Sequence, residues 1–177
     1  MSDPDRLRLE TLFAKHAGAV RAYALRRIDS ASAEETVSEV FLIAWRRLSE
    51  LPEDPLPWLL ACARRVLANQ RRATRRRLAL LERVAEARDH EPIELDGAPL
   101  GDRALERALA ELSEDDRELL LLSAWDRLAP EQLAATLGCS RGTLAVRLHR
   151  ARRRLAHALE RAERERSGST TTLEALG

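Results

Sequence analysis

Apolar residues recur at the spacing of an amphipathic helix in the first part of the chain. Residues 33–49 carry them at i, i+3, i+4, i+7 and i+11, which places them on one face: Val37, Val40, Phe41, Ala44 and Leu48. A capping box formed by Ser32 and Glu35 is expected to start this helix. A preceding helix is expected over about residues 5–28, because its apolar positions also recur along the segment.

A proline-rich segment follows these two helices. Pro52, Pro55 and Pro57 predict a rigid loop, because closely spaced prolines cannot propagate a helix. Pro57 suits the first turn of a third helix that starts at Trp58 and continues to about Ala87. Residues 88–101 then lose the periodicity and gather Asp, Glu, Pro and Gly, a composition typical of a flexible acidic linker.

A second helical unit is predicted over residues 102–161. Asp102 can cap a helix that ends near Glu111, and Ser113 with Asp116 resembles another capping box. The pattern then predicts a short helix from Pro130 to the Leu137–Gly138 pair, and a final helix capped by Ser140 and ending near Arg161. Residues 162–177 are expected to form a disordered tail.

Composition supports an all-α chain with two small helical domains, residues 5–87 and 102–161. Ala, Leu, Arg and Glu dominate the 177 residues and aromatics make up only 3%, which argues against a sandwich, barrel or doubly wound sheet. No membrane-spanning stretch or secretory signal is recognisable, so a cytoplasmic protein is expected. Cys62 and Cys139 lack metal-ligand spacing, and each is interpreted as a small buried apolar residue.

The distribution of charge indicates a polyanionic partner. The formal net charge is only +1, yet residues 61–80 carry seven arginines and residues 140–159 carry six, with no acid in either block. Solvated helix faces usually mix the two signs. At physiological ionic strength charges more than about 8 Å apart are largely screened, so distant acids cannot neutralise these blocks. We therefore expect two separate contacts with nucleic acid.

A helix-turn-helix motif over residues 130–155 overlaps the second basic block. Such a motif needs a small residue on the first helix, a glycine in the turn and an aliphatic residue on the second helix that packs against the first. These positions are occupied by Ala134, Gly138 and Leu144. The helix after Gly138 would then enter the major groove. The residues expected to reach base edges and flanking phosphates are Ser140, Arg141, Thr143 and Arg147. Those expected to meet backbone phosphates are Arg150, Arg152, Arg153 and Arg154.

Together, the helix at 33–48, the loop and basic helix at 51–77, the acidic linker and the helix-turn-helix resemble bacterial RNA polymerase sigma factors of the extracytoplasmic-function (ECF) class. The resemblance covers roughly residues 7–160. It implies a region 2 domain, a linker and a region 4 domain, and a protein that directs core RNA polymerase to promoters and nucleates strand opening. It also implies binding to the β′ clamp helices and the β flap of the polymerase, to promoter DNA, and in some members to an anti-sigma factor.

The resemblance assigns roles in the first domain. Residues matching the segment that docks on the clamp helices are Glu35, Glu39, Phe41 and Trp45. Residues matching the helix that contacts the melted −10 element are Arg64, Arg65, Asn69, Arg71 and Arg72, preceded by the base-capturing loop at 48–58. The chain departs from the family on the recognition helix, where Ala145 and Val146 replace the commoner Lys-Ser pair.

Two other classes were weighed. An autonomous helix-turn-helix regulator that never binds polymerase would not need the basic helix behind a base-capturing loop. An enzyme would need a chemical site, but the four histidines show no metal spacing and no nucleophile motif or phosphate-binding loop occurs. No cofactor and no catalytic activity are therefore expected.

Overall fold

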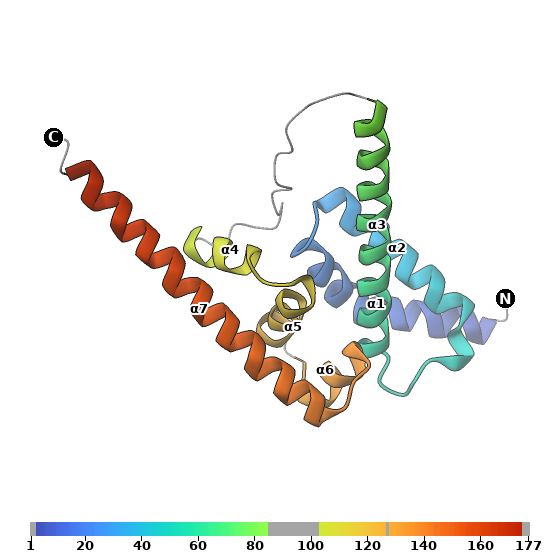
Figure 1. Cartoon of the computed structure of the whole chain (residues 1–177). Helices are drawn as coiled ribbons and strands as arrows, with labels where there is room; N and C mark the ends of the chain where they lie inside the picture. The colour runs from blue at the N-terminus through green and yellow to red at the C-terminus, as the bar shows by residue number, and fades with distance from the viewer. Residues whose placement is uncertain (1–2, 85–102, 127, 175–177) are drawn as a thin grey trace. The chain divides into compact units, whose positions relative to one another are not determined.

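A computed structural model describes residues 3–84, 103–126 and 128–174. All elements in these ranges are helices, and the chain divides into two compact units, Met1–Ala98 and Pro99–Gly177 (Figure 1). This confirms the expected all-α class. The predicted acidic linker at 88–101 lies outside the described residues. No helix in the described ranges is long and apolar enough to cross a membrane.

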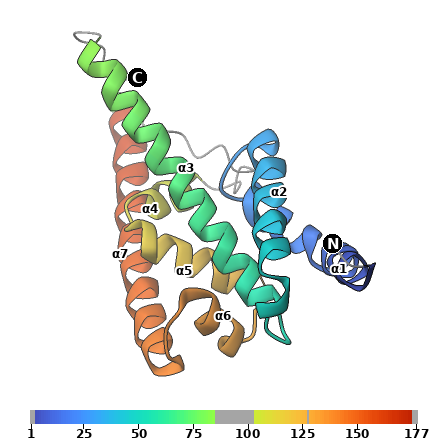
Figure 2. The same ribbon diagram turned by 90° about the vertical axis from the view of Figure 1, so that its right-hand side faces the viewer.

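The first unit is a bundle of α1 (Asp3–Leu25), α2 (Ser30–Arg46) and α3 (Leu56–Val84), each of which packs on the other two. A short 3₁₀ turn, Leu48–Glu50, leads into the proline loop. The core takes its fully buried side chains from all three helices: Val20, Tyr23, Val40, Leu59 and Leu60. The second half of α3 continues past the other two helices (Figure 2), and Arg72, Arg75, Arg76 and Arg77 are exposed along it.

The predicted start of α2 is wrong. Asp29, rather than Ser32, caps the helix: its carboxylate accepts hydrogen bonds from the backbone N–H of Ser32 at 3.0 Å and from the Ser32 hydroxyl at 2.7 Å. A carboxylate also interacts favourably with the positive end of the helix dipole, which favours the earlier start. The predicted position of Pro57 in the first turn of α3 is confirmed, with the helix beginning at Leu56.

The second unit consists of α4 (Arg103–Ala110), α5 (Glu114–Trp125), α6 (Pro130–Leu137) and α7 (Arg141–Glu174), and the first three all pack against α7. Their common core contains Leu119, Leu122, Leu133 and Leu144, with Ala151 of α7 fully buried. The predicted cap of α5 is confirmed, since the hydroxyl of Ser113 accepts a bond from the backbone N–H of Asp116. The expected capping role of Asp102 falls outside the described residues.

The final helix is longer than predicted. It continues to Glu174, so the expectation that it ends near Arg161 and that a disordered tail follows is wrong for residues 162–174. Ala162 is buried, Arg161 pairs with Glu111 beside α4, and Arg164 lies near Glu160 one turn earlier. These contacts, together with the strong helix propensity of Ala, Glu and Arg, favour continuation beyond the predicted end.

Candidate nucleic-acid interfaces and a docking groove

The turn between α6 and α7 has the geometry that the motif predicts. Gly138 adopts a left-handed conformation (φ 64°, ψ 36°), which a residue with a side chain rarely takes. Its N–H and that of Cys139 donate to the carbonyls of Ala135 and Ala134 at the end of α6. Ala134 and Leu144 are each only 4% exposed, so the small residue of α6 and the aliphatic residue of α7 both pack as expected.

The helix after this turn has one buried and one exposed face. Leu144, Ala151 and Ala158 lie in the core, whereas Thr143, Arg150 and Arg153 are exposed. Among the described residues, none forms an ion pair or hydrogen bond with the side chain of Arg150 or Arg153. At about 100° per residue, these exposed side chains lie on the side of α7 away from the core. This face can therefore lie along a nucleic-acid duplex with its charges unneutralised.

Other residues predicted for this surface are held by intramolecular bonds. The hydroxyl of Ser140 accepts from the N–H of Thr143 at 3.2 Å, which confirms its capping role, and lies 2.9 Å from the Thr143 hydroxyl. Arg141 forms a 2.8 Å ion pair with Glu131 at the start of α6. Arg147 is half-buried at the side of the helix. Only a rearrangement of these side chains would make all of them available to bases.

Arg154 differs from the other arginines of the block. It forms an ion pair with Asp116, whose side chain is only 11% exposed, in the first turn of α5. The pair joins α7 to α5 within the unit. The Arg154 side chain is still 61% exposed, so its expected phosphate contact stays a prediction, as does that of the exposed Arg152.

On α3, the five residues predicted to contact the −10 element fall on two different lines along the helix. Arg65, Asn69 and Arg72 are exposed and repeat at i, i+4 and i+7, and Arg72 donates to the amide oxygen of Asn69. Arg64 and Arg71 lie beside this line and are half-buried. The next exposed position of the line is Arg76. It belongs to the first basic block but is not among the five residues predicted to contact the −10 element. We call Arg65, Asn69, Arg72 and Arg76 the α3 stripe.

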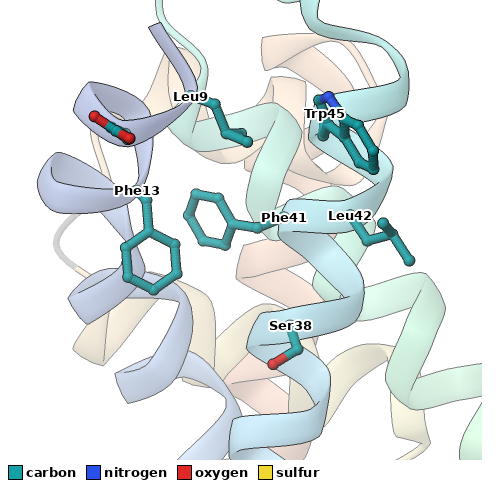
Figure 3. A pocket seen from close by; sticks show the side chains of 7 residues that line it. Leu9, Phe13, Ser38, Phe41, Leu42 and Trp45 are labelled. Carbon is teal, nitrogen blue, oxygen red and sulfur yellow. The ribbon is translucent and has the colours of Figure 1, made fainter. Parts of the chain in front are cut away.

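A hollow of about 480 Å³ opens between α1 and α2 (Figure 3). Glu10 and Ser38 are part of its lining. The other lining side chains are apolar: Leu9, Phe13, Phe41, Leu42 and Trp45. We call it the α1–α2 groove. Phe13 and Phe41 meet edge to face with ring centroids 4.8 Å apart, and Figure 3 shows the two rings facing each other from the two helices. This arrangement is a favoured geometry for an aromatic pair.

The groove leaves large apolar surfaces in contact with solvent. Phe13 is 49% exposed, Trp45 46% and Leu42 40%, whereas Phe41 is only 6% exposed. Of the predicted docking residues, Trp45 is therefore available to a partner, and Phe41 shapes the floor of the groove from below. Contiguous exposed apolar side chains of this kind mark interaction sites.

Acidic side chains adjoin the groove. Glu35 and Glu39 are exposed on α2, two turns and one turn before Leu42 respectively, and Glu10 contributes to the lining from α1. The two glutamates of α2 are among the predicted docking residues, whereas Leu9, Phe13 and Leu42 are not. The signal for Leu42 was available, because it lies at i+7 from Glu35 and outside the apolar stripe of its helix.

Two titratable groups of the first unit, Cys62 and His16, are buried and have shifted pKa values. Burial raises the pKa of the Cys62 thiol, with Arg65 and Arg47 acting in the opposite direction. Burial, assisted by Lys15, lowers the pKa of His16, which is 7% exposed on α1. Cys62 is buried as expected and Cys139 is half-buried; both are free thiols.

Family models match both units. Residues 12–77 match Sigma-70 region 2, and residues 102–155 match Sigma-70, region 4. The chain is also 31% identical over 158 residues to the ECF RNA polymerase sigma factor SigL of Mycobacterium tuberculosis, an alignment that covers 86% of this chain and 89% of SigL. The chain belongs to the ECF class of RNA polymerase sigma factors. Its order of regions is the one that the resemblance implied.

Other similarities agree with this assignment. This sigma factor is 30% identical over 159 residues to the RNA polymerase sigma factor CarQ of Myxococcus xanthus, covering 88% of this chain and 91% of CarQ. Among solved structures it resembles the sigma factor RpoE of Bartonella quintana, crystallised in complex with the anti-sigma factor NepR. That match has a TM-score of 0.62 and 26% identity, and covers 85% of this chain and 96% of RpoE. CnrH, solved with the cytosolic domain of CnrY, shares the fold at a TM-score of 0.58 and 22% identity, with coverage of 86% of this chain and 87% of CnrH.

Proposed function

We propose that this sigma factor recruits core RNA polymerase to promoters through three surfaces with distinct roles. The α1–α2 groove binds the polymerase, the α3 stripe binds the melted −10 element, and the exposed face of α7 binds the −35 duplex. The matched region 2 thus handles polymerase and strand opening, and the matched region 4 handles duplex recognition.

The observation that carries this proposal is the pairing of a buried apolar face with an exposed arginine face on one helix in each unit. Leu59, Leu60 and Leu67 anchor α3 in its bundle, while the α3 stripe projects from it. Folding therefore fixes the direction in which each set of charges points. The planar guanidinium group of arginine matches the geometry of a phosphate, and its binding releases counterions from the nucleic acid.

The α1–α2 groove suits a helical partner with basic flanks. Its apolar lining would cover the apolar positions of an inserted helix, and Glu35 and Glu39 would attract lysines or arginines beside it. The β′ clamp helices of core polymerase are the partner that family membership implies, and the β flap is the corresponding partner of the second unit. An anti-sigma factor is a further partner, supported by the similarity to RpoE in its complex with NepR. With these partners, the protein is expected to act in the cytoplasm.

Reconstituted run-off transcription tests the proposal. Core polymerase, a library of promoter fragments and nucleotides are combined with and without the purified chain. We expect defined transcripts only when the chain is present, and we expect their loss when Arg65 and Arg72 of the α3 stripe are both changed to Glu. If the chain binds promoter fragments but supports no transcript and does not associate with core polymerase, it acts as an autonomous regulator and the proposal is wrong.

A further inference from the structure

Val146 is an unusual residue for its position on α7. It is 51% exposed, whereas the other aliphatic positions nearby, Leu144 and Ala151, are buried on the opposite side of the helix. A β-branched side chain is a poorer helix former than the straight-chain residues that normally occupy exposed positions. Its exposed methyl groups also leave apolar surface in water.

A second unfavourable choice lies one turn earlier. Gly142 is exposed in the same helix, and a Cβ atom added there would have only the Ser140 hydroxyl within 4 Å, at 3.9 Å. Glycine costs about 1 kcal/mol relative to alanine in a helix interior, and less at Gly142, which is the second residue of α7. Since no neighbouring atom of the protein requires a glycine, the missing side chain serves an approach from outside. Gly142 and Val146 lie on the same face, because they are separated by four residues.

Cationic side chains continue this face. Arg150 and Arg153 are exposed one and two turns after Val146, and residues 140–159 contain no acid. The face thus carries in succession an open backbone at Gly142, a pair of methyl groups at Val146, and two guanidinium groups. In a helix that enters the major groove N-terminus first, bases lie near the first turns and phosphates near the later ones.

From this juxtaposition we infer that Val146 determines specificity by contacting the C5-methyl group of a thymine in the upstream promoter element. The major groove displays that methyl as its one apolar feature, and small apolar side chains read it by direct contact. Gly142 allows the DNA to approach closely enough for the contact. The inference rests on the proposed function, in which α7 binds duplex DNA.

Replacing thymine by uracil removes only this methyl group and therefore tests the inference directly. A promoter is first selected from a randomised library with the polymerase holoenzyme assembled on the full chain. Each thymine of its upstream element is then replaced by uracil in turn, and holoenzyme affinity is measured at one fixed salt concentration. For the wild type we expect a loss of about 3–5-fold at one thymine or two adjacent ones, because burying one methyl-sized group contributes about that factor.

The variant Val146→Ala should lose a similar factor on the thymine promoter and should then be indifferent to uracil. Val146→Ile should retain the sensitivity, and Arg150→Ala should weaken binding to every template alike. Because alanine is the better helix former, Val146→Ala should melt no earlier than the wild type, which separates lost recognition from lost folding.

The inference is overturned if Val146→Ala binds all templates as the wild type does, which would leave the exposed valine to a protein partner. It is also overturned if the variant keeps its response to uracil, or if the selected upstream element contains no thymine that matters. A wild-type holoenzyme with no upstream sequence preference, and no response to Arg150→Ala, would instead show that the proposed role of α7 is wrong.

Discussion

Truncating Trp45 should weaken the complex with core polymerase about tenfold. Trp45 exposes 46% of its surface at the mouth of the α1–α2 groove, which is ~115 Å² for a side chain of roughly 250 Å². Covering all of it would contribute about 3 kcal/mol at ~25 cal/mol per Å². A helix seated in the groove covers only the side that faces it, so about half of this free energy, or roughly tenfold in affinity, should be lost in Trp45→Ala.

The assay is an equilibrium titration of labelled sigma factor with core polymerase, read by fluorescence anisotropy. The matched control is Leu7→Ala, which removes a side chain that is 66% exposed on α1 but does not line the groove. We expect the control to bind as the wild type does. Because about half of Trp45 is covered inside the unit, Trp45→Ala should unfold at a lower temperature, so the titrations are run well below the unfolding transitions of both variants. Equal losses in the two variants, or full affinity in Trp45→Ala, would show that the groove is not the docking site.

Three further outcomes are expected. Reversing Arg65 and Arg72 to Glu should abolish promoter opening, seen as absent permanganate reactivity at thymines, while upstream duplex binding persists; normal reactivity would contradict the role of α3. Glu131→Gln should release Arg141 and strengthen upstream binding by about 2–4-fold, since an exposed ion pair contributes about 0.2–1 kcal/mol. An unchanged affinity in band-shift titrations would show that the ion pair does not compete with DNA. Burial lowers the pKa of His16 in the folded state, so the unfolded chain binds the proton more readily. The free energy of unfolding should therefore fall as the pH drops below 6.5, and urea titrations should show a smaller fall in His16→Gln.

Local signals in the sequence were sufficient where one residue type alone could satisfy the geometry. The turn at Gly138 needed a positive φ, and the cap at Ser113 needed a side-chain acceptor; both were predicted and are confirmed. The start of α2 was mispredicted because two acceptors competed. Asp29 and Ser32 both suit a cap, and pattern alone does not show that the carboxylate three residues earlier prevails.

Side-chain roles proved harder to predict than helices. The groove depends on which face of α1 meets α2, and Phe13 lies there because its ring pairs with Phe41 from a segment 28 residues later in the chain. Arg154 belongs to a basic block, yet a partner 38 residues earlier, Asp116, holds it within the protein. A count of charges along the chain cannot separate such an arginine from its exposed neighbours, because the difference arises only in tertiary packing.

The proposed function requires the α3 stripe and the exposed face of α7 to contact one promoter at two separate places. Hydroxyl-radical footprinting of the holoenzyme on a selected promoter measures this directly. We expect two protected segments: Arg65→Glu with Arg72→Glu should remove only the downstream protection, and Arg150→Glu with Arg153→Glu only the upstream protection. A single protected segment, or variants that lose both protections together, would contradict the division of roles between the two units.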